Sequence, residues 1–254
     1  MRRIAELLSA FIRSDFALRY RDSLLGFLWV LVKPFLLFLI LFVVFSRLFG
    51  AQDPQYTLKL LLGILLFSYF SEGTSRGLSS LVERAEVLTR IHFPRGIAVG
   101  SPVVSSFLNF LAAFAVFFLV RFFLAPEVPV SLLGVGYFFG LVILLTFFIL
   151  GISFFASILF VRFRDLGIIW DLALQLLFFA TPILYPLEFL PARLRDVALW
   201  NPLAVVILES KSALIAGSFL GAFPVGLAIL IALVVFFAGY FAFLRFVPRV
   251  IEYL

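Results

Sequence analysis

Residues 131–161 have the sequence SLLGVGYFFGLVILLTFFILGISFFASILFV, which contains no charged side chain. An α-helix rises 1.5 Å per residue, and about 20 apolar residues cross the hydrocarbon core of a bilayer. This stretch therefore predicts a membrane-spanning helix. At about 45 Å the helix would be longer than the core is thick, so it must tilt or project from the bilayer.

Five other apolar stretches are long enough to cross a bilayer. With the first, they give predicted spans at residues 27–49, 58–79, 97–123, 131–161, 166–185 and 223–247. Hydrophobic residues make up 64% of the chain and charged residues 13%, whereas a soluble domain has about 45–50% and about 25%. We therefore expect an all-α integral membrane protein with six transmembrane helices, in a single domain that covers residues 1–254.

Residues 1–22 precede the first span and predict an amphipathic helix. Apolar and polar side chains alternate at helical spacing on two faces. The apolar face has Ile4, Leu7, Leu8, Phe11 and Ile12, and the polar face has Arg2, Arg3, Glu6, Arg13 and Ser14. We expect this helix to lie in the headgroup plane in contact with membrane lipid. An ordinary solvated helix is the alternative.

The basic residues predict the orientation of the chain in the membrane. With the N-terminus inside, fourteen of the 20 Lys and Arg residues fall in inner segments and six in outer segments. This bias predicts that both termini are cytoplasmic. The net charge of +6 could also suggest a nucleic-acid partner, but the charges are dispersed between apolar spans. We therefore expect none.

Two segments interrupt the apolar pattern. Residues 81–96 form the longest internal polar loop, and their charges could sit on a short helix that ends at Phe93-Pro94, because the residue before proline disfavours helix. Residues 186–222 are apolar but contain several prolines and charges. We predict one or two re-entrant or interfacial helices there, on the outer side, which form an outward gate. A plain external loop is the alternative.

Several kinds of chemistry are missing from the sequence. No Gly-Lys pair occurs, so the chain has no G-x-x-x-x-G-K-[ST] phosphate loop. His92 is the only histidine and there is no cysteine, so neither a zinc site nor a His-based triad can form within one chain. We predict no catalytic residue, metal site or cofactor. His92 by itself is most simply an ordinary loop residue.

Asp171 is the main candidate for a carboxylate inside a span, with Gln175 four residues later as a possible partner. A charge at membrane depth suggests function, but the position is shallow, so helix packing or water contact is the alternative. Four Gly-x-x-x-Gly pairs occur, and chance matches are expected among 16 glycines. Only Gly136 and Gly140 are interpreted as a close-packing motif.

The segment from Asp15 to Pro34, DFALRYRDSLLGFLWVLVKP, resembles the opening of the polysaccharide-export permeases of ABC transporters. Members of that family carry an R-Y-x-x-S-x-L-G-x-L-W run just before the first span. Three further stretches resemble the family in order: RIHFPR at 90–95 with Pro102 beyond, RFRDL at 162–166, and TPILYP at 181–186 followed by Leu190-Pro191 and Asn201-Pro202-Leu203. Lys211 departs from the Tyr-Arg type pair of many members.

The likeness covers nearly the whole chain and is closest to the Wzm-type permeases, which export O-antigen polysaccharide. It implies a subunit of a type-2 ABC exporter that moves lipid-linked polysaccharide across the bacterial inner membrane. It also implies a homodimer with two copies of a separate cytoplasmic ATPase, which would bind ATP and Mg. Teichoic acid, capsule or a small hydrophobic compound are alternative cargoes. A membrane-embedded glycan or lipid enzyme is the alternative of another class, but its clustered His or Asp-x-Asp carboxylates are absent.

The resemblance assigns roles to individual residues. Coupling to the ATPase is expected of Glu83, Arg84, Glu86, Arg90, His92, Phe93, Pro94 and Arg95 in the 81–96 loop. The joint between the interfacial helix and the first span has Arg19, Tyr20, Ser23, Gly26, Trp29 and Pro34. Arg164 and Asp165 begin the fifth span, where a carboxylate can cap the helix. The outer gate has Thr181, Pro182, Tyr185, Asn201 and Pro202.

Overall fold

The computed structural model of the chain describes residue 6 and residues 9–15, 26–45, 55–90, 93–124, 131–215 and 219–250. Within these ranges the chain is helical and no strand occurs, which confirms the all-α prediction. Residues 9–15 form one helical segment, called the N-terminal helix below. The predictions for Arg19, Tyr20, Ser23 and His92 lie outside the described residues.

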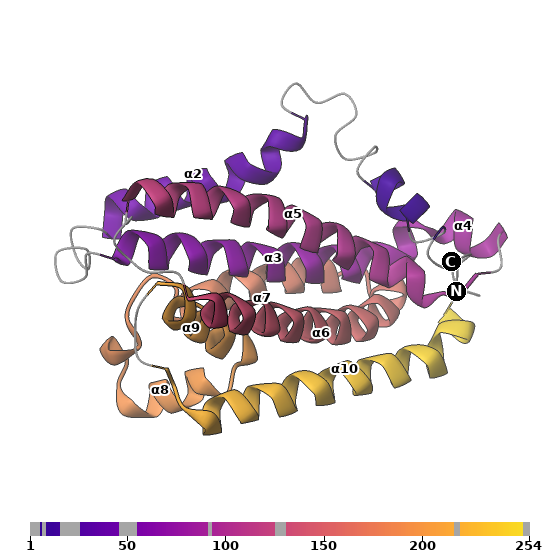
Figure 1. Cartoon of the computed structure of the whole chain (residues 1–254). Helices are drawn as coiled ribbons and strands as arrows, with labels where there is room; N and C mark the ends of the chain where they lie inside the picture. The colour runs from indigo at the N-terminus through magenta and orange to yellow at the C-terminus, as the bar shows by residue number, and fades with distance from the viewer. Residues whose placement is uncertain are drawn as a thin grey trace.

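The remaining described elements are also helices (Figure 1). In chain order they are η1 (Gly26–Leu28), α2 (Trp29–Phe45), α3 (Tyr56–Glu83), α4 (Ala85–Arg90), α5 (Gly96–Leu124), α6 (Leu132–Arg162), α7 (Leu166–Ala180), η3 (Leu187–Phe189), α8 (Ala192–Leu199), α9 (Pro202–Leu214) and α10 (Ala222–Val250).

Four of the described helices are long and apolar enough to cross a membrane, rather than the six that the sequence predicts. They cover Gly26–Phe45, Gly96–Phe123, Leu132–Arg162 and Ala222–Val250. The pair α8 and α9, bent by 95° at its break, would add a fifth if it counted as one span. Each of the four matches a predicted span closely, because a long apolar run in lipid must form a helix to satisfy its backbone hydrogen bonds.

The other two predicted spans differ from the structure in different ways. The predicted span at 166–185 ends early: α7 has 15 residues and rises about 22 Å, less than the roughly 30 Å of a hydrocarbon core. Pro182 and Pro186 follow it and stop the helix. Helix α3, with 28 residues, is longer than the predicted span at 58–79, and it carries charges along its length.

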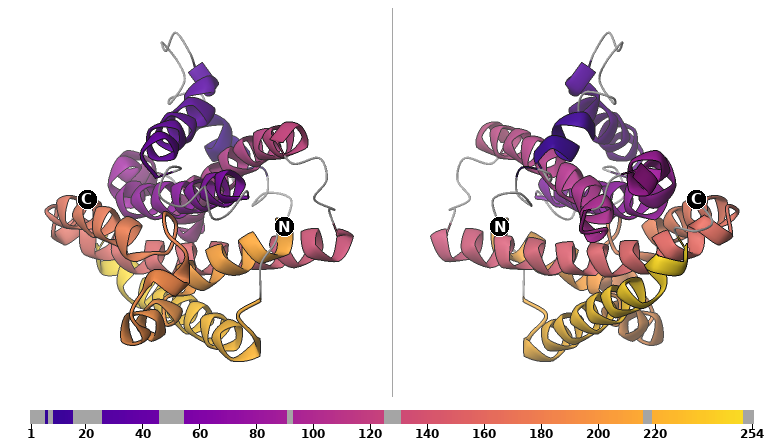
Figure 2. Two further views of the ribbon diagram at one scale, coloured as in Figure 1. Left: turned by 90° about the vertical axis from the view of Figure 1, so that its left-hand side faces the viewer. Right: turned by 90° about the vertical axis from the view of Figure 1, so that its right-hand side faces the viewer.

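Helix α3 is the centre of the bundle. It contacts α2, α4, α5, α6, α7 and α9, and the end views show it between the α2 and α5 layer and the α6 and α10 layer (Figure 2). Leu60, Leu61 and Leu62 are at most 1% exposed. Because successive residues of a helix point about 100° apart, burial of three in a row means that protein surrounds α3 on all sides.

Glycines let the central helices approach closely, but not the pair that the sequence suggested. A Cβ at Gly73 would lie 2.8 Å from Ile149 Cγ2 on α6, and one at Gly77 would collide with the Ser153 side chain. Gly136 and Gly140 have no atom within 4 Å of such a Cβ, so their interpretation as a close-packing motif within the chain is wrong.

The segment after α7 is buried against α3. Residues 181–184 are buried, and the hydroxyl of Tyr56 at the start of α3 donates to the Leu184 carbonyl over 2.8 Å. Helix α9 begins with Pro202 in its first turn, and the Asn201 side chain accepts from Leu203 N over 3.0 Å. The 186–222 segment thus contains two short helices with a sharp bend, not a plain loop.

The two ends of the bundle carry different elements (Figure 1). Helix α4, the N-terminal helix and the last turn of α10 lie together at one end, called the α4 end below. Helix α8 and the first turn of α10 lie at the other end, called the α8 end. The polar loop and the bent helix pair, both singled out from the sequence, therefore lie on opposite ends of the molecule.

Candidate functional site

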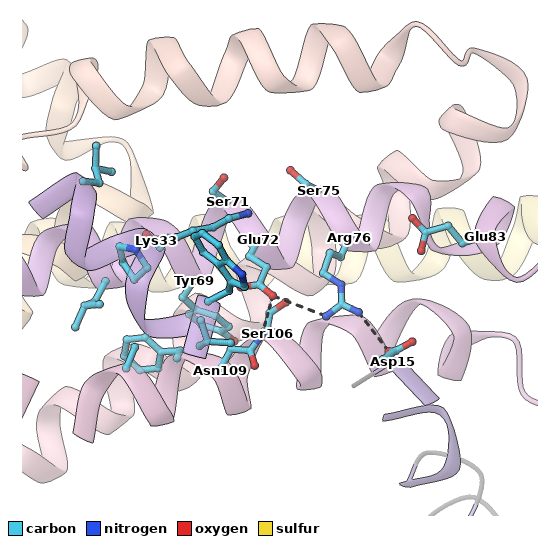
Figure 3. Close-up of a pocket in the computed structure, with 18 residues that line it drawn as sticks. Asp15, Lys33, Tyr69, Ser71, Glu72, Ser75, Arg76, Glu83, Ser106 and Asn109 are labelled. Atoms are coloured by element: carbon cyan, nitrogen blue, oxygen red, sulfur yellow. Dashed lines mark hydrogen bonds and ion pairs between the residues drawn. The ribbon is translucent and has the colours of Figure 1, made fainter. Parts of the chain in front are cut away.

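A cavity of about 730 Å³ lies between α2, α3 and α5. It has apolar walls and a row of polar side chains, most of them on one face of α3 (Figure 3). The polar members are Asp15, Lys33, Ser68, Tyr69, Ser71, Glu72, Ser75, Arg76, Glu83, Ser106 and Asn109. Charged groups that lie between the helices of a membrane protein are rare and suggest function.

Glu72 and Arg76 form the central pair of the cavity. They are one helical turn apart on α3, and the closest N–O distance between their charged groups is 3.8 Å. The amide of Asn109 on α5 donates to Glu72 Oε1 over 2.8 Å. Figure 3 shows both interactions on the same side of α3. The Glu72 carboxylate is thus stabilised by a cation from its own helix and by a neutral donor from the next.

Asp15 connects the N-terminal helix to this pair. Its carboxylate lies 3.7 Å from the Arg76 guanidinium and 2.5 Å from that of Arg84. The Ser105 hydroxyl donates to the same carboxylate over 3.4 Å. Asp15 and Arg84 have side-chain exposures of only 12% and 10%. Removal of either partner would therefore leave a poorly solvated charge without its counter-ion, which is costly.

Arg84 is a junction of three elements. It follows the last residue of α3 and precedes α4, and its guanidinium also donates to the Ala98 carbonyl in the first turn of α5. The same guanidinium lies over the Phe11 ring, 5.2 Å from its centroid, and Phe11 packs against Phe93 with ring centroids 5.3 Å apart. Salt bridge, cation–π contact and ring packing together attach the N-terminal helix to the 84–98 segment.

Helix α4 presents charges to solvent. Glu86 and Arg90 pair over 2.8 Å, with side chains 80% and 75% exposed, and Glu83 is exposed as well. Leu88 on the opposite face is 7% exposed and anchors the helix. A short helix is present in 81–96 as predicted, but it covers Ala85–Arg90 and carries Glu86 and Arg90, whereas Glu83 ends α3. Arg84, which the sequence places in the same docking set, is buried in the network instead.

The residues predicted for the joint before the first span and for the start of the fifth span lie in separate places. Trp29 and Pro34 line the cavity, and Gly26 has a φ of 47°, a backbone conformation that glycine adopts readily. Asp165 occupies the N-cap position of α7, but its side chain makes no capping hydrogen bond. The Arg164 guanidinium lies over the Phe160 ring, 5.5 Å from its centroid.

A second group of charges lies toward the α8 end. Glu209 on α9 is 1% exposed and accepts from the Tyr137 hydroxyl over 2.8 Å and from Leu220 N over 2.6 Å. Lys211 donates to the carbonyls of Pro182 and Ile183, over 2.9 and 3.3 Å. Of the predicted gate residues, Thr181, Pro182 and Pro202 are buried here, and Tyr185 and Asn201 are partly buried.

Sequence reasoning missed Glu72, Asn109 and Glu209 and chose Asp171 in their place. Asp171 and Gln175 are both exposed, and the described residues include no hydrogen bond between them. The available signal was a Glu72–Arg76 pair at i,i+4 inside a predicted span, which is unusual in lipid. Within the described ranges, no three His, Cys, Asp or Glu side chains group to hold a metal ion.

Comparison with known proteins places the chain in a family. The sequence profile of the family described as "ABC-2 type transporter" matches residues 6–208. An O-antigen export system permease protein RfbA of Klebsiella pneumoniae is 30% identical over 111 residues, which is 44% of this chain and 43% of that protein. The protein of the same name from Myxococcus xanthus is 30% identical over 105 residues, 41% of this chain and 40% of its own length. The matched part thus spans less than half of these relatives, whereas the family profile covers most of the chain. This protein belongs to the ABC-2 type transporter family.

Proposed function

We propose that this chain is the transmembrane subunit of an ATP-driven exporter, and that its cargo is a lipid-linked polysaccharide of the O-antigen type. Membership of the ABC-2 family supports an exporter subunit in a multi-pass membrane protein. The printed names of the relatives support the cargo. The sequence has no phosphate loop, so a separate ATPase chain would have to supply ATP and Mg binding.

In this proposal the bundle crosses the inner membrane six times. Two further crossings would come from α3, shielded from lipid by its neighbours, and from α7 continued by the buried residues 181–184. The α4 end would face the cytoplasm, in keeping with the fourteen basic residues assigned to inner segments. The bent α8–α9 pair would then lie at the outer side and form the gate.

One observation carries the proposed mechanism: Asp15 joins the N-terminal helix to both α3 and the start of α4. An ATPase that docks on the exposed Glu83, Glu86 and Arg90 would push on α4, and Arg84 lies directly beside α4. The push would then reach Asp15, the N-terminal helix and the cavity next to α2. A network that has two discrete arrangements can couple one site of a protein to another.

A second copy of the chain would complete the path for the cargo. Helix α2 supports this, because Phe38 is its only buried residue. Ile40 and Val43 on its outer face are 63% and 70% exposed. An apolar face of this size can meet either lipid or another protein. In the proposed assembly two copies face each other and two ATPases lie below them.

The first test is purification of the tagged protein from native membranes in mild detergent, with mass spectrometry of the proteins that come with it. We expect a stoichiometric ATPase with a phosphate loop. If the chain purifies alone and remains stable, no ATPase couples to it and the exporter assignment fails.

The docking surface is tested by charge reversal in the purified complex. Glu86→Lys and Arg90→Glu should each lower transport-coupled ATP hydrolysis, while the chain still inserts in the membrane, because both side chains are exposed. Glu188→Lys, an exposed carboxylate at the α8 end, is the matched control for docking and should leave the amount of co-purified ATPase unchanged. Normal transport by the α4 variants would show that the ATPase docks elsewhere.

A further inference from the structure

A second cavity opens between α6 and α10 at the α4 end of the bundle, apart from the network of Asp15. Its volume is about 400 Å³. The walls are apolar and come from both helices, with Phe155 and Ile158 from α6 and Ala242 and Phe246 from α10. Phe155 and Phe246 are 52% and 46% exposed. The groove is therefore open on its outer side and accessible to an apolar chain from the bilayer.

The groove ends in two cations. Arg162 in the last turn of α6 and Arg249 in the last turn of α10 both line it. Among the described residues, no carboxylate lines the groove and no ion pair is recorded for either arginine. Arg162 makes one contact with an aromatic ring, its guanidinium lying 5.9 Å from the centroid of Phe163. Two exposed guanidinium groups thus share one groove, and no described residue places a counter-charge inside it.

We infer that this groove binds one anionic phospholipid of the bilayer, with its phosphate at Arg162 and Arg249 and an acyl chain along Phe155, Ile158 and Phe246. Guanidinium groups suit phosphate oxygens because their paired N–H donors match them. Basic pockets between membrane helices on the cytoplasmic side are known to recognise lipid headgroups. The position at the ends of two spans places the arginines at headgroup level, whether or not the chain is an exporter.

The test is native mass spectrometry of the purified protein after incubation with equal amounts of phosphatidylglycerol and phosphatidylcholine. Wild type should retain phosphatidylglycerol preferentially. In the variant Arg162→Gln/Arg249→Gln the amount of retained phosphatidylglycerol should fall at least about tenfold, since each basic residue near an anionic lipid adds to the binding free energy. Arg245→Gln is the matched control, because Arg245 is exposed one turn earlier on α10 and does not line the groove.

A second variant guards against misfolding of the first. Ala242→Phe keeps both arginines and fills the groove, so it should also lose phosphatidylglycerol. The inference is overturned if the arginine pair can be removed without loss, if Arg245→Gln loses as much, or if phosphatidylcholine is retained equally. It is also overturned if a polyprenyl phosphate displaces the phospholipid, because the site would then serve a different lipid. A changed oligomeric mass in the arginine variant without lipid loss would instead identify an interface between copies.

Discussion

Charges toward the two ends of the bundle are stabilised in different ways. At the α4 end, Asp15 is held by the guanidinium groups of Arg76 and Arg84, so side chains of separate elements hold one another. Toward the α8 end, Glu209 accepts from a backbone N–H and a phenol, and Lys211 donates to two backbone carbonyls.

The difference indicates which part of the molecule can switch. A salt bridge between two side chains can exchange partners when elements move, and Arg76 already lies between two carboxylates. A charged side chain that is hydrogen-bonded to the main chain fixes the position of that one backbone segment. We therefore expect motion at the α4 end and a fixed arrangement around α9. Four predictions test this contrast, in order of decreasing effect on stability.

Glu209→Ala should have the largest effect. It removes the acceptor of both the Tyr137 hydroxyl and Leu220 N in a site that is 1% exposed, and should lower the free energy of unfolding by about 3 kcal/mol. The measurement is SDS-driven unfolding of the detergent-solubilised protein, followed by circular dichroism. Glu188→Ala, an exposed carboxylate at the same end, should change it by less than about 0.5 kcal/mol. Equal effects would contradict a fixed arrangement around α9.

Asp15→Asn should destabilise the N-terminal helix more than the bundle. The variant loses the charge that pairs with Arg84 and Arg76. We expect the free energy of local opening of residues 9–15 to fall by about 2 kcal/mol. Hydrogen exchange with mass spectrometry measures this, and helix α9 should exchange as in wild type. Asp196→Asn on the exposed surface of α8 is the control. Slow exchange of residues 9–15 in Asp15→Asn would show that the network does not hold this helix.

Lys211→Met should have an intermediate effect. It keeps the length of the side chain but removes the donor to the Pro182 and Ile183 carbonyls, which should cost about 1 kcal/mol in the same unfolding assay. Arg193→Met on the exposed face of α8 should be close to neutral. A larger loss than that of Glu209→Ala would mean that the 181–186 segment, not the Tyr137 contact, fixes α9.

Glu86→Gln should have the smallest effect on stability. Its pair with Arg90 is 80% exposed on the glutamate side, and such pairs contribute less than about 0.5 kcal/mol. If the unfolding free energy falls by more than that, α4 is held by its charges and not by Leu88, and its charged face would not be free for a partner.

The apolar helices could be predicted from the sequence because length and composition decide them. Helices α5, α6 and α10 begin and end within three residues of the predicted bounds, since a long apolar run in lipid can only form a helix. The end of α7 could not be predicted by hydropathy, because residues 181–185 are almost as apolar as the helix before them. Pro182, not a change in polarity, ends it.

The network at the α4 end could not be predicted from one sequence. Asp15 and Arg84 are 69 residues apart, and nothing in their local pattern distinguishes them from other charged residues near a membrane. Only the Glu72–Arg76 pair carried a local signal, because its i,i+4 spacing lies within a predicted span. The choice of Gly136 and Gly140 failed for a related reason, since spacing alone does not say which face meets a neighbour.

The crossing of α6 and α10 has a consequence for how this protein can change over time. A Cβ at Gly151 would lie 2.6 Å from Phe236 Cα, and one at Gly239 would collide with the Gly151 carbonyl, so main chain meets main chain. Helices in lipid are held by close packing more than by the hydrophobic effect, and the thickness of the backbone alone sets this spacing. Side chains elsewhere can therefore be exchanged freely without altering the distance between these two helices, whereas one added methyl group at either glycine would alter it at once.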